Sequence, residues 1–134
     1  WGADSQTADN LQKDELSVFE SKTKGLKFRE KRDNGVGISA LTDNWILPRA
    51  MLAQVADTSL TGRGEEAAFV IARISEAQTA ISARSRGKIN VQVIMERMKG
   101  GGHLTAAALQ RENTSVKDLR EELITTLDEV MKEE

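Results

Sequence analysis

The chain is organised around the stretch Lys99-Gly100-Gly101-Gly102-His103-Leu104-Thr105-Ala106-Ala107-Ala108, which holds three of its ten glycines and its only histidine. Glycine has no Cβ, so the backbone here can take a positive φ and approach a ligand closely. A run of exposed backbone N–H groups can form a concave anion site, and an adjacent imidazole adds a donor or a charge. The residues alone leave a second interpretation open, which is a helix–strand connector carrying a surface histidine.

The segments on both sides of this stretch have clear periodicity. Residues 91–98 predict a helix that Asn90 caps, because apolar residues recur at i, i+3, i+4 and i+7. Residues 106–110 predict a short strand. Residues 115–132 predict the most regular helix of the chain, which begins with a capping sequence at Ser115. The expected buried residues of the two helices are Val91, Ile94, Met95, Met98, Val116, Leu119, Leu123, Leu127 and Val130.

Residues 48–85 predict one helix and two strands. Pro48 suits the start of a helix that Gly62 ends. Residues 67–72 form a nearly continuous apolar run, which is typical of a strand covered on both faces. Residues 79–85 predict a second strand, whose alternation places Arg84 on the face away from Ile81 and Ala83. The alternative interpretation of Arg84 is an exposed charge at a strand end. Asp57, with no histidine or second carboxylate beside it, is interpreted as a solvated or capping acid.

The first part of the chain predicts a linker, a helix and a hairpin. Residues 1–24 are interpreted as a linker with an N-terminal helix over 11–23, and residues 25–134 as one folded domain. Alternating residues at 26–29 and 36–39 flank Asp33-Asn34-Gly35, a hairpin-turn signal. The predicted fold class is therefore α/β, a single domain with a mixed sheet of about five strands and helices packed on it.

Composition excludes several classes of function. The 134 residues carry 19 basic and 21 acidic side chains, a net charge of -2, so no global basic field attracts nucleic acid. The absence of cysteine excludes disulfides, thiolate metal sites and a cysteine nucleophile. No apolar run approaches the roughly 18 residues of a membrane span, and no signal peptide is visible. We expect a soluble, cytoplasmic chain without membrane contact, although a longer parent chain with a membrane anchor stays open.

Two motifs with fixed spacing resemble one known family. The sequence Ile81-Ser82-Ala83-Arg84-Ser85, then Asn90-Val91, then Gly100-Gly101-Gly102-His103 with Ala107-Ala108, resembles the DHH-associated domain. That domain is the C-terminal half of DHH-family phosphoesterases, and the resemblance is strongest to the cyclic-di-AMP phosphodiesterase branch. It covers roughly residues 25–132. In the family this domain binds the substrate nucleotide, and a separate upstream domain holds two metal ions, usually manganese.

The resemblance implies a substrate-binding role for one set of residues: Arg84, Ser85, Gly100, Gly101, Gly102 and His103. It implies no catalytic or metal-binding residue in this chain, because His103 is the only histidine and the Asp-His-His motif of the upstream domain is absent. Manganese is expected in the missing catalytic domain. The expected partners are that domain and a cyclic or linear dinucleotide or short oligonucleotide, and the chain alone is expected to be inactive. A homodimer stays open.

Two departures from the family and two other functions stay open. The family often has glycine where this chain has Lys99 and asparagine where it has Ala106. Lys99 either contacts phosphate or points to water, and the loss of the asparagine amide leaves the base preference undetermined. The alternative function is a noncatalytic RNA- or tRNA-binding module, as in the C-terminal part of alanyl-tRNA synthetase, where the same domain type occurs. A third interpretation makes the glycine stretch a connector only.

Overall fold

The computed structural model of the chain describes residues 29–31, 35–60 and 66–132. The predicted helix over 11–23, most of the strand over 26–29 and Gly62 lie outside the described residues. The elements follow one another as β1 (Arg29–Lys31), β2 (Val36–Ala40), α2 (Arg49–Ser59), β3 (Ala67–Arg73), β4 (Gln78–Ser85), α3 (Val91–Arg97), β5 (Gly101–Gly102), β6 (Ala106–Glu112) and α4 (Val116–Lys132).

The strands form one mixed sheet in the order β1-β2-β3-β4-β6-β5. β2 and β3 are parallel, and every other neighbouring pair is antiparallel. β1 and β2 pair antiparallel, as the predicted hairpin requires. The α/β fold with a mixed sheet of about five strands is confirmed, and the two-residue β5 is the sixth strand. Gly101–Gly102 lies in the edge strand of the sheet, paired with β6, and not in a connector alone.

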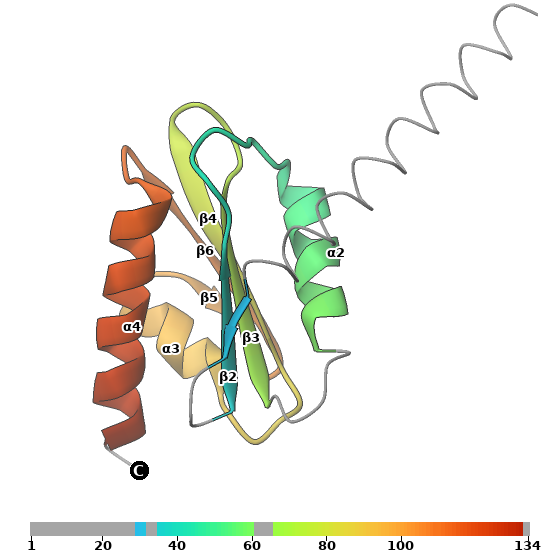
Figure 1. Ribbon diagram of the computed structural model, residues 1–134. Coiled ribbons are helices and arrows are strands. Elements are labelled where there is room, and N and C mark those ends of the chain that lie inside the picture. The colour runs from blue at the N-terminus through green and yellow to red at the C-terminus, as the bar shows by residue number, and fades with distance from the viewer. Residues whose placement is uncertain (1–28, 32–34, 61–65, 133–134) are drawn as a thin grey trace, which may run out of the picture.

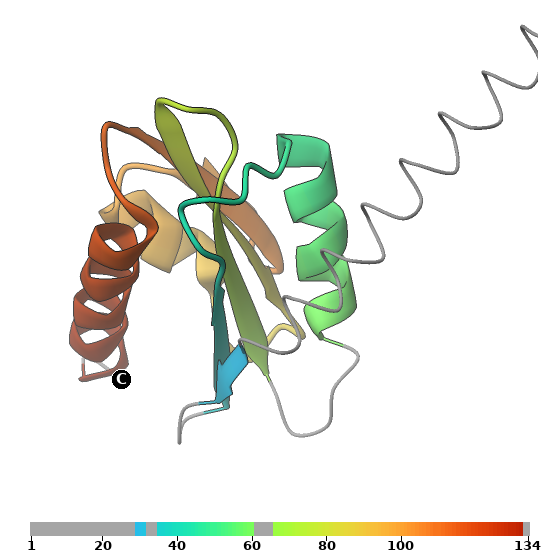
Figure 2. The same ribbon diagram turned by 45° about the horizontal axis from the view of Figure 1, so that its top comes forward.

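Helices cover both faces of the sheet (Figures 1 and 2). α3 and α4 lie on one face and α2 lies on the other. β3 is buried on both faces, as its apolar run predicted. Phe69 and Ile71 belong to the large core under α3 and α4, while Val70 and Ala72 belong to the smaller core under α2. No helix within the described ranges is long and apolar enough to cross a membrane.

The structure confirms which residues of the predicted helices are buried. The Asn90 side chain accepts a hydrogen bond from the Val93 N–H at 3.3 Å and caps α3. All nine residues predicted to be buried in α3, its C-cap and α4 are buried. Pro48 directly precedes α2, and its carbonyl accepts the Leu52 N–H at 3.0 Å. α2 ends at Ser59, which is earlier than the predicted stop at Gly62.

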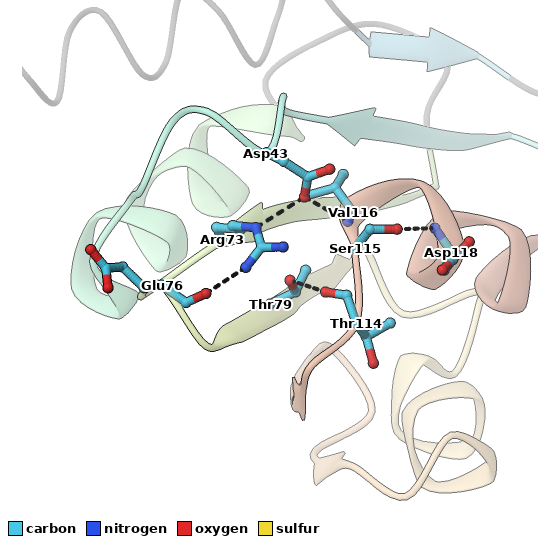
Figure 3. Close-up of polar contacts among 8 residues, drawn as sticks. All are labelled: Asp43, Arg73, Glu76, Thr79, Thr114, Ser115, Val116 and Asp118. Carbon is cyan, nitrogen blue, oxygen red and sulfur yellow. Dashed lines mark hydrogen bonds and ion pairs between the residues drawn. The ribbon is translucent and has the colours of Figure 1, made fainter.

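One carboxylate ties the loop after β2 to β3 and to the start of α4 (Figure 3). Asp43 Oδ1 accepts hydrogen bonds from Arg73 Nε at 3.1 Å and from the Val116 N–H at 3.0 Å. The Val116 N–H is one of the donors at a helix start that lack a partner inside the helix. Ser115 Oγ accepts a second such donor, the Asp118 N–H, at 3.1 Å. Asp43 therefore links three segments that are distant in the sequence.

We expect Asp43→Ala to lower the free energy of unfolding by about 1–2 kcal/mol, because it removes the acceptor of the Val116 N–H and the partner of Arg73. Asp43→Asn should cost less, since its amide oxygen still accepts the Val116 N–H. Urea denaturation of the two variants measures this order. Glu129→Ala, which removes an exposed acid from α4, is the control and should stay within about 0.5 kcal/mol of the parent. If Asp43→Ala and the control have the same free energy of unfolding, the structural role assigned to Asp43 is wrong.

Candidate nucleotide-binding edge

Arg84 and His103 lie in one row across the sheet. Arg84 of β4 is directly opposite Ala106 of β6, and the His103 N–H donates to the Ala106 carbonyl oxygen at 2.7 Å. Neighbouring strands are about 4.8 Å apart, so the Cα atoms of Arg84 and His103 are about 10 Å apart. The end of β4 and the end of the glycine stretch are therefore adjacent in the fold, although 18 residues separate them in the sequence.

A carboxylate from α2 fixes the Arg84 side chain. Arg84 Nε donates to Asp57 Oδ1 at 2.6 Å, and Nη1 donates to the Ala83 carbonyl oxygen at 2.9 Å. The Arg84 side chain is 18% exposed, whereas that of Asp57 is 66% exposed. Of the five N–H donors of the guanidinium, two are thus used within the described part of the chain. Sequence reasoning missed Asp57 as a partner, because nothing in the sequence links residues 27 positions apart.

Close packing on β6 requires two of the three glycines. A Cβ at Gly100 would collide with the Ala108 carbonyl oxygen and lie 2.6 Å from Leu109 Cβ. A Cβ at Gly102 would collide with the backbone of Ala107, and Gly102 also has a φ of +144°. Gly101 is different, because a Cβ there meets nothing within 4 Å and its φ is not positive. The fold therefore does not explain why residue 101 is a glycine.

The open position at Gly101 lies on the face that carries Arg84. Directly opposed residues of antiparallel strands share a face, so Gly101, Ala108 and Ser82 form one row on that face. Arg84 and Ala106, two residues further along their strands, form the next row on the same face. α2 packs on β3 and β4, and Ala108 stays exposed. The result is an open surface with a floor of small residues and Arg84 at one end.

An open pocket of about 170 Å³ continues this surface between α2 and β6. Its lining includes Arg49 and Leu52 of α2, Ser82 of β4, and Ala108 and Gln110 of β6. The pocket lies toward the start of α2, and the Arg84–Asp57 pair lies toward its end. The surface along α2 is therefore hollowed at one end and carries a fixed guanidinium at the other.

The edge strand also offers a backbone donor. In an antiparallel pair, successive residues direct their N–H groups alternately toward the partner strand and away from it. The His103 N–H bonds to β6, so the Gly102 N–H is directed away from β6. Because β5 is the outermost strand of the sheet, this N–H faces an open edge. An anion at the edge could therefore meet a backbone donor and the exposed His103.

The structure does not bring the Ser85 side chain together with the other predicted site residues. Ser85 follows Arg84 in β4, so its side chain projects to the opposite face of the sheet. The side chain is buried; its hydroxyl donates to the Ile89 carbonyl oxygen at 2.6 Å and accepts the Gly87 N–H at 2.9 Å. These bonds shape the turn between β4 and α3. The predicted contact between Ser85 and substrate stays a prediction.

A tight turn connects the end of α3 to β5. The Lys99 N–H donates to the Glu96 carbonyl oxygen at 3.0 Å, and the Gly100 N–H donates to the Met95 carbonyl oxygen at 2.7 Å. This is the hydrogen-bond pattern of a Schellman turn, whose left-handed residue is usually glycine. Here it is Lys99, with a φ of 69°, and such a conformation costs a non-glycine residue about 1–2 kcal/mol. A glycine at this position, as the resembled family often has, would avoid the cost.

Residues suited to a metal site are not found in the described ranges. Within residues 29–31, 35–60 and 66–132, no group of three or more His, Asp or Glu side chains is placed to hold a metal ion. Two-metal hydrolysis needs several such side chains converging on two ions about 3.5–4 Å apart. The residues that the structure describes therefore do not fit a two-metal centre.

Comparison with known proteins places the chain in a family. The sequence model of the DHHA1 domain family matches residues 33–133 of this chain. The cyclic-di-AMP phosphodiesterase GdpP of Geobacillus thermodenitrificans is 37% identical over 122 residues, which is 91% of this chain and 18% of that protein. The cyclic-di-AMP phosphodiesterase PdeA of Listeria monocytogenes is 35% identical over 133 residues, which is 99% of this chain and 20% of that protein. The chain thus spans about a fifth of the length of these relatives.

A solved structure has the same fold. An exopolyphosphatase-related protein from Bacteroides fragilis superposes with a TM-score of 0.67 at 18% identity, covering 87% of this chain and 34% of that one. The family match covers most of the described residues, including both ends of the row from Arg84 to His103. The chain belongs to the DHHA1 domain family and is related in sequence to the cyclic-di-AMP phosphodiesterases.

Proposed function

We propose that this chain recognises the phosphate group of a cyclic or short linear dinucleotide and presents the nucleotide to a phosphodiesterase active site. The observation that carries the proposal is Gly101, a glycine that packing does not require, on the same face as Arg84. A position without a side chain, on the same face as a fixed guanidinium, lets a ligand approach the backbone closely. The relatives named for cyclic-di-AMP support this class of substrate.

Arg84 is the main phosphate contact in this proposal. A guanidinium binds phosphate through two parallel charge-assisted hydrogen bonds, which a lysine ammonium cannot make. The ion pair with Asp57 holds the guanidinium in place before the ligand arrives, so less side-chain entropy is lost on binding. The Gly102 N–H and the exposed His103 supply further donors at the edge, and the nucleotide lies on the floor formed by Ala106 and Ala108.

The hydrolytic step belongs to a separate domain in this proposal. The curated relatives are about five times as long as this chain, which leaves room for a catalytic domain of the DHH type with manganese. This chain would then hold the nucleotide in position while that domain activates water. Its contribution to the rate is orientation of the substrate, which lowers the entropic part of the barrier.

An RNA-binding module is the second candidate function. Surfaces that bind RNA broadly are usually basic, whereas this chain has a net charge of -2. The charge therefore favours a local contact with a small ligand over an extended contact with tRNA. Binding of tRNA without binding of dinucleotides would favour the second candidate.

We expect Arg84→Lys to weaken binding of cyclic-di-AMP and of its linear dinucleotide by about 2 kcal/mol or more, because lysine keeps the charge and loses the planar fork. Arg84→Ala should cost about 2–4 kcal/mol, and His103→Ala about 1–2 kcal/mol, the range for one hydrogen bond. Isothermal titration calorimetry measures all three values.

Arg73→Lys is the matched control for this series. Arg73 also pairs through Nε with an aspartate, Asp43, and its side chain is 23% exposed. It lies at the opposite end of the β3–β4 hairpin from Arg84. Its replacement by lysine should leave dinucleotide affinity unchanged while removing a comparable hydrogen bond from Nε to an aspartate. If Arg84→Lys binds like the parent, or if both lysine variants lose affinity equally, the phosphate contact lies elsewhere.

Gly101→Val should abolish nucleotide binding and leave thermal stability close to that of the parent. Its side chain enters open space on the Arg84 face, and a β-branched residue suits a strand. Gly102→Val is the control, because it collides with the backbone of Ala107 and has a positive φ, so it should lower Tm strongly. Thermal melting and calorimetry on the same samples separate the two effects. Retained affinity in Gly101→Val would favour the connector interpretation.

The chain alone should show no phosphodiesterase activity, with or without added manganese. The physical reason is the lack of converging metal ligands in the described residues. Chromatographic detection of the linear dinucleotide and mononucleotide after incubation with cyclic-di-AMP is the measurement. Metal-dependent turnover that follows the protein through purification would contradict the proposed division between two domains.

A further inference from the structure

A second basic cluster lies on the other face of the sheet, under α3 and α4. A pocket of about 330 Å³ is lined by Arg97, Met98, Lys99, Arg111 and Glu122. Its lining contains three cationic side chains and a single carboxylate. Arg111 follows Leu109 by two residues in β6, so it projects to the face of the large core. The pocket is therefore on the opposite face from Arg84 and Gly101.

Arg111 binds both oxygens of the Glu122 carboxylate. Arg111 Nη1 donates to Glu122 Oε1 at 2.9 Å, and Nη2 donates to Glu122 Oε2 at 2.8 Å. This bidentate bond raises the pKa of Arg111 and lowers the pKa of Glu122, and the nearby charge of Lys99 lowers the Glu122 pKa further. Both groups are thus charged at neutral pH. The pair fixes the guanidinium at the pocket wall.

The carbonyl oxygens at the end of α3 have hydrogen-bond donors other than the Lys99 ammonium. The carbonyl oxygens of Met95 and Glu96 accept the N–H groups of the Schellman turn, and that of Met98 accepts Arg111 Nη2 at 2.9 Å. Within the described part of the chain, the Lys99 ammonium makes no hydrogen bond. Yet the chain keeps lysine at a left-handed position where glycine would be less strained. Among the described residues the Lys99 charge attracts Glu122, but no hydrogen bond holds the ammonium there, and a strained residue of this kind is a candidate for function.

We propose that this pocket binds a phosphate group, with the Lys99 ammonium and the free donors of Arg111 as its ligands. Three of the five N–H donors of Arg111 bond to Glu122 and Met98. The other two donors have no partner among the described residues. The pocket has the volume of about ten water molecules, enough for one hydrated phosphate group. The proposal does not depend on the nucleotide site at Arg84, because it uses other residues on the other face.

The test is a titration of the 134-residue chain with inorganic phosphate, followed by amide NMR at constant ionic strength with chloride as the balancing anion. We expect saturable shifts at residues 97–100 and 111. Lys99→Gly should weaken binding at least tenfold and raise Tm, because it relieves the left-handed strain. Lys99→Arg keeps the charge and should keep most of the affinity. Lys117→Gln removes an exposed lysine of α4 outside the pocket and should change neither quantity.

A second arm identifies the source of the phosphate group. The Arg84→Lys chain is titrated with a 5′-phosphorylated mononucleotide, so that failure of the proposed function at Arg84 does not affect the outcome. Tighter binding than inorganic phosphate at residues 97–100 identifies a nucleotide, and equal binding identifies free phosphate. The proposal is overturned if no saturable shift occurs in either arm, or if Lys99→Gly binds phosphate like the parent. The cluster would then serve only to tie α3 and α4 to β6.

Discussion

The backbone at Gly100 and Gly102 lies against β6 so closely that neither position has room for a Cβ. This contact places β5 beside β6, and β6 in turn pairs with β4 over seven residues. The distance from Arg84 to His103 is fixed by these two registers. A side chain at either glycine would push the edge strand away, and the row of residues across the sheet would be lost. The arrangement of the candidate site therefore depends on a backbone contact that only glycine permits.

The three glycines of the stretch therefore have different structural roles. Gly100 and Gly102 allow the edge strand to pack, and Gly102 also provides a conformation with positive φ. Gly101 contributes neither, and its open side lies on the face that carries the floor of small residues and Arg84. A glycine run is usually explained as one flexible unit. Here the packing separates the positions that the fold needs from the one that it does not, and only the latter supports an argument about a ligand.

Periodicity predicted the elements well, because each buries a face whose spacing is visible in the sequence. The stripe from Val116 to Val130 and the apolar run of β3 are examples. The pairing of Gly101–Gly102 with β6 was not predicted, since it depends on register and not on local pattern. The partners of Arg84 and Arg111 were also beyond prediction, because their carboxylates lie 27 and 11 residues away. The resemblance identified the family, but it did not show that Ser85 and Arg84 project to opposite faces.

The surface around Arg84 and the pocket around Arg111 are built in the same way. On each face a guanidinium from a sheet strand is held by a carboxylate from a helix, Asp57 for Arg84 and Glu122 for Arg111. Such a pair at a partly exposed site adds little to stability. Its larger effect is to fix the direction of the donors that the carboxylate leaves unused, because a rigid guanidinium loses less entropy when it binds an anion. The carboxylate also lowers the local positive charge, so that an anion is held by directed hydrogen bonds more than by net charge. That balance would suit the reversible phosphate binding that we propose for both faces of a chain whose overall charge is negative.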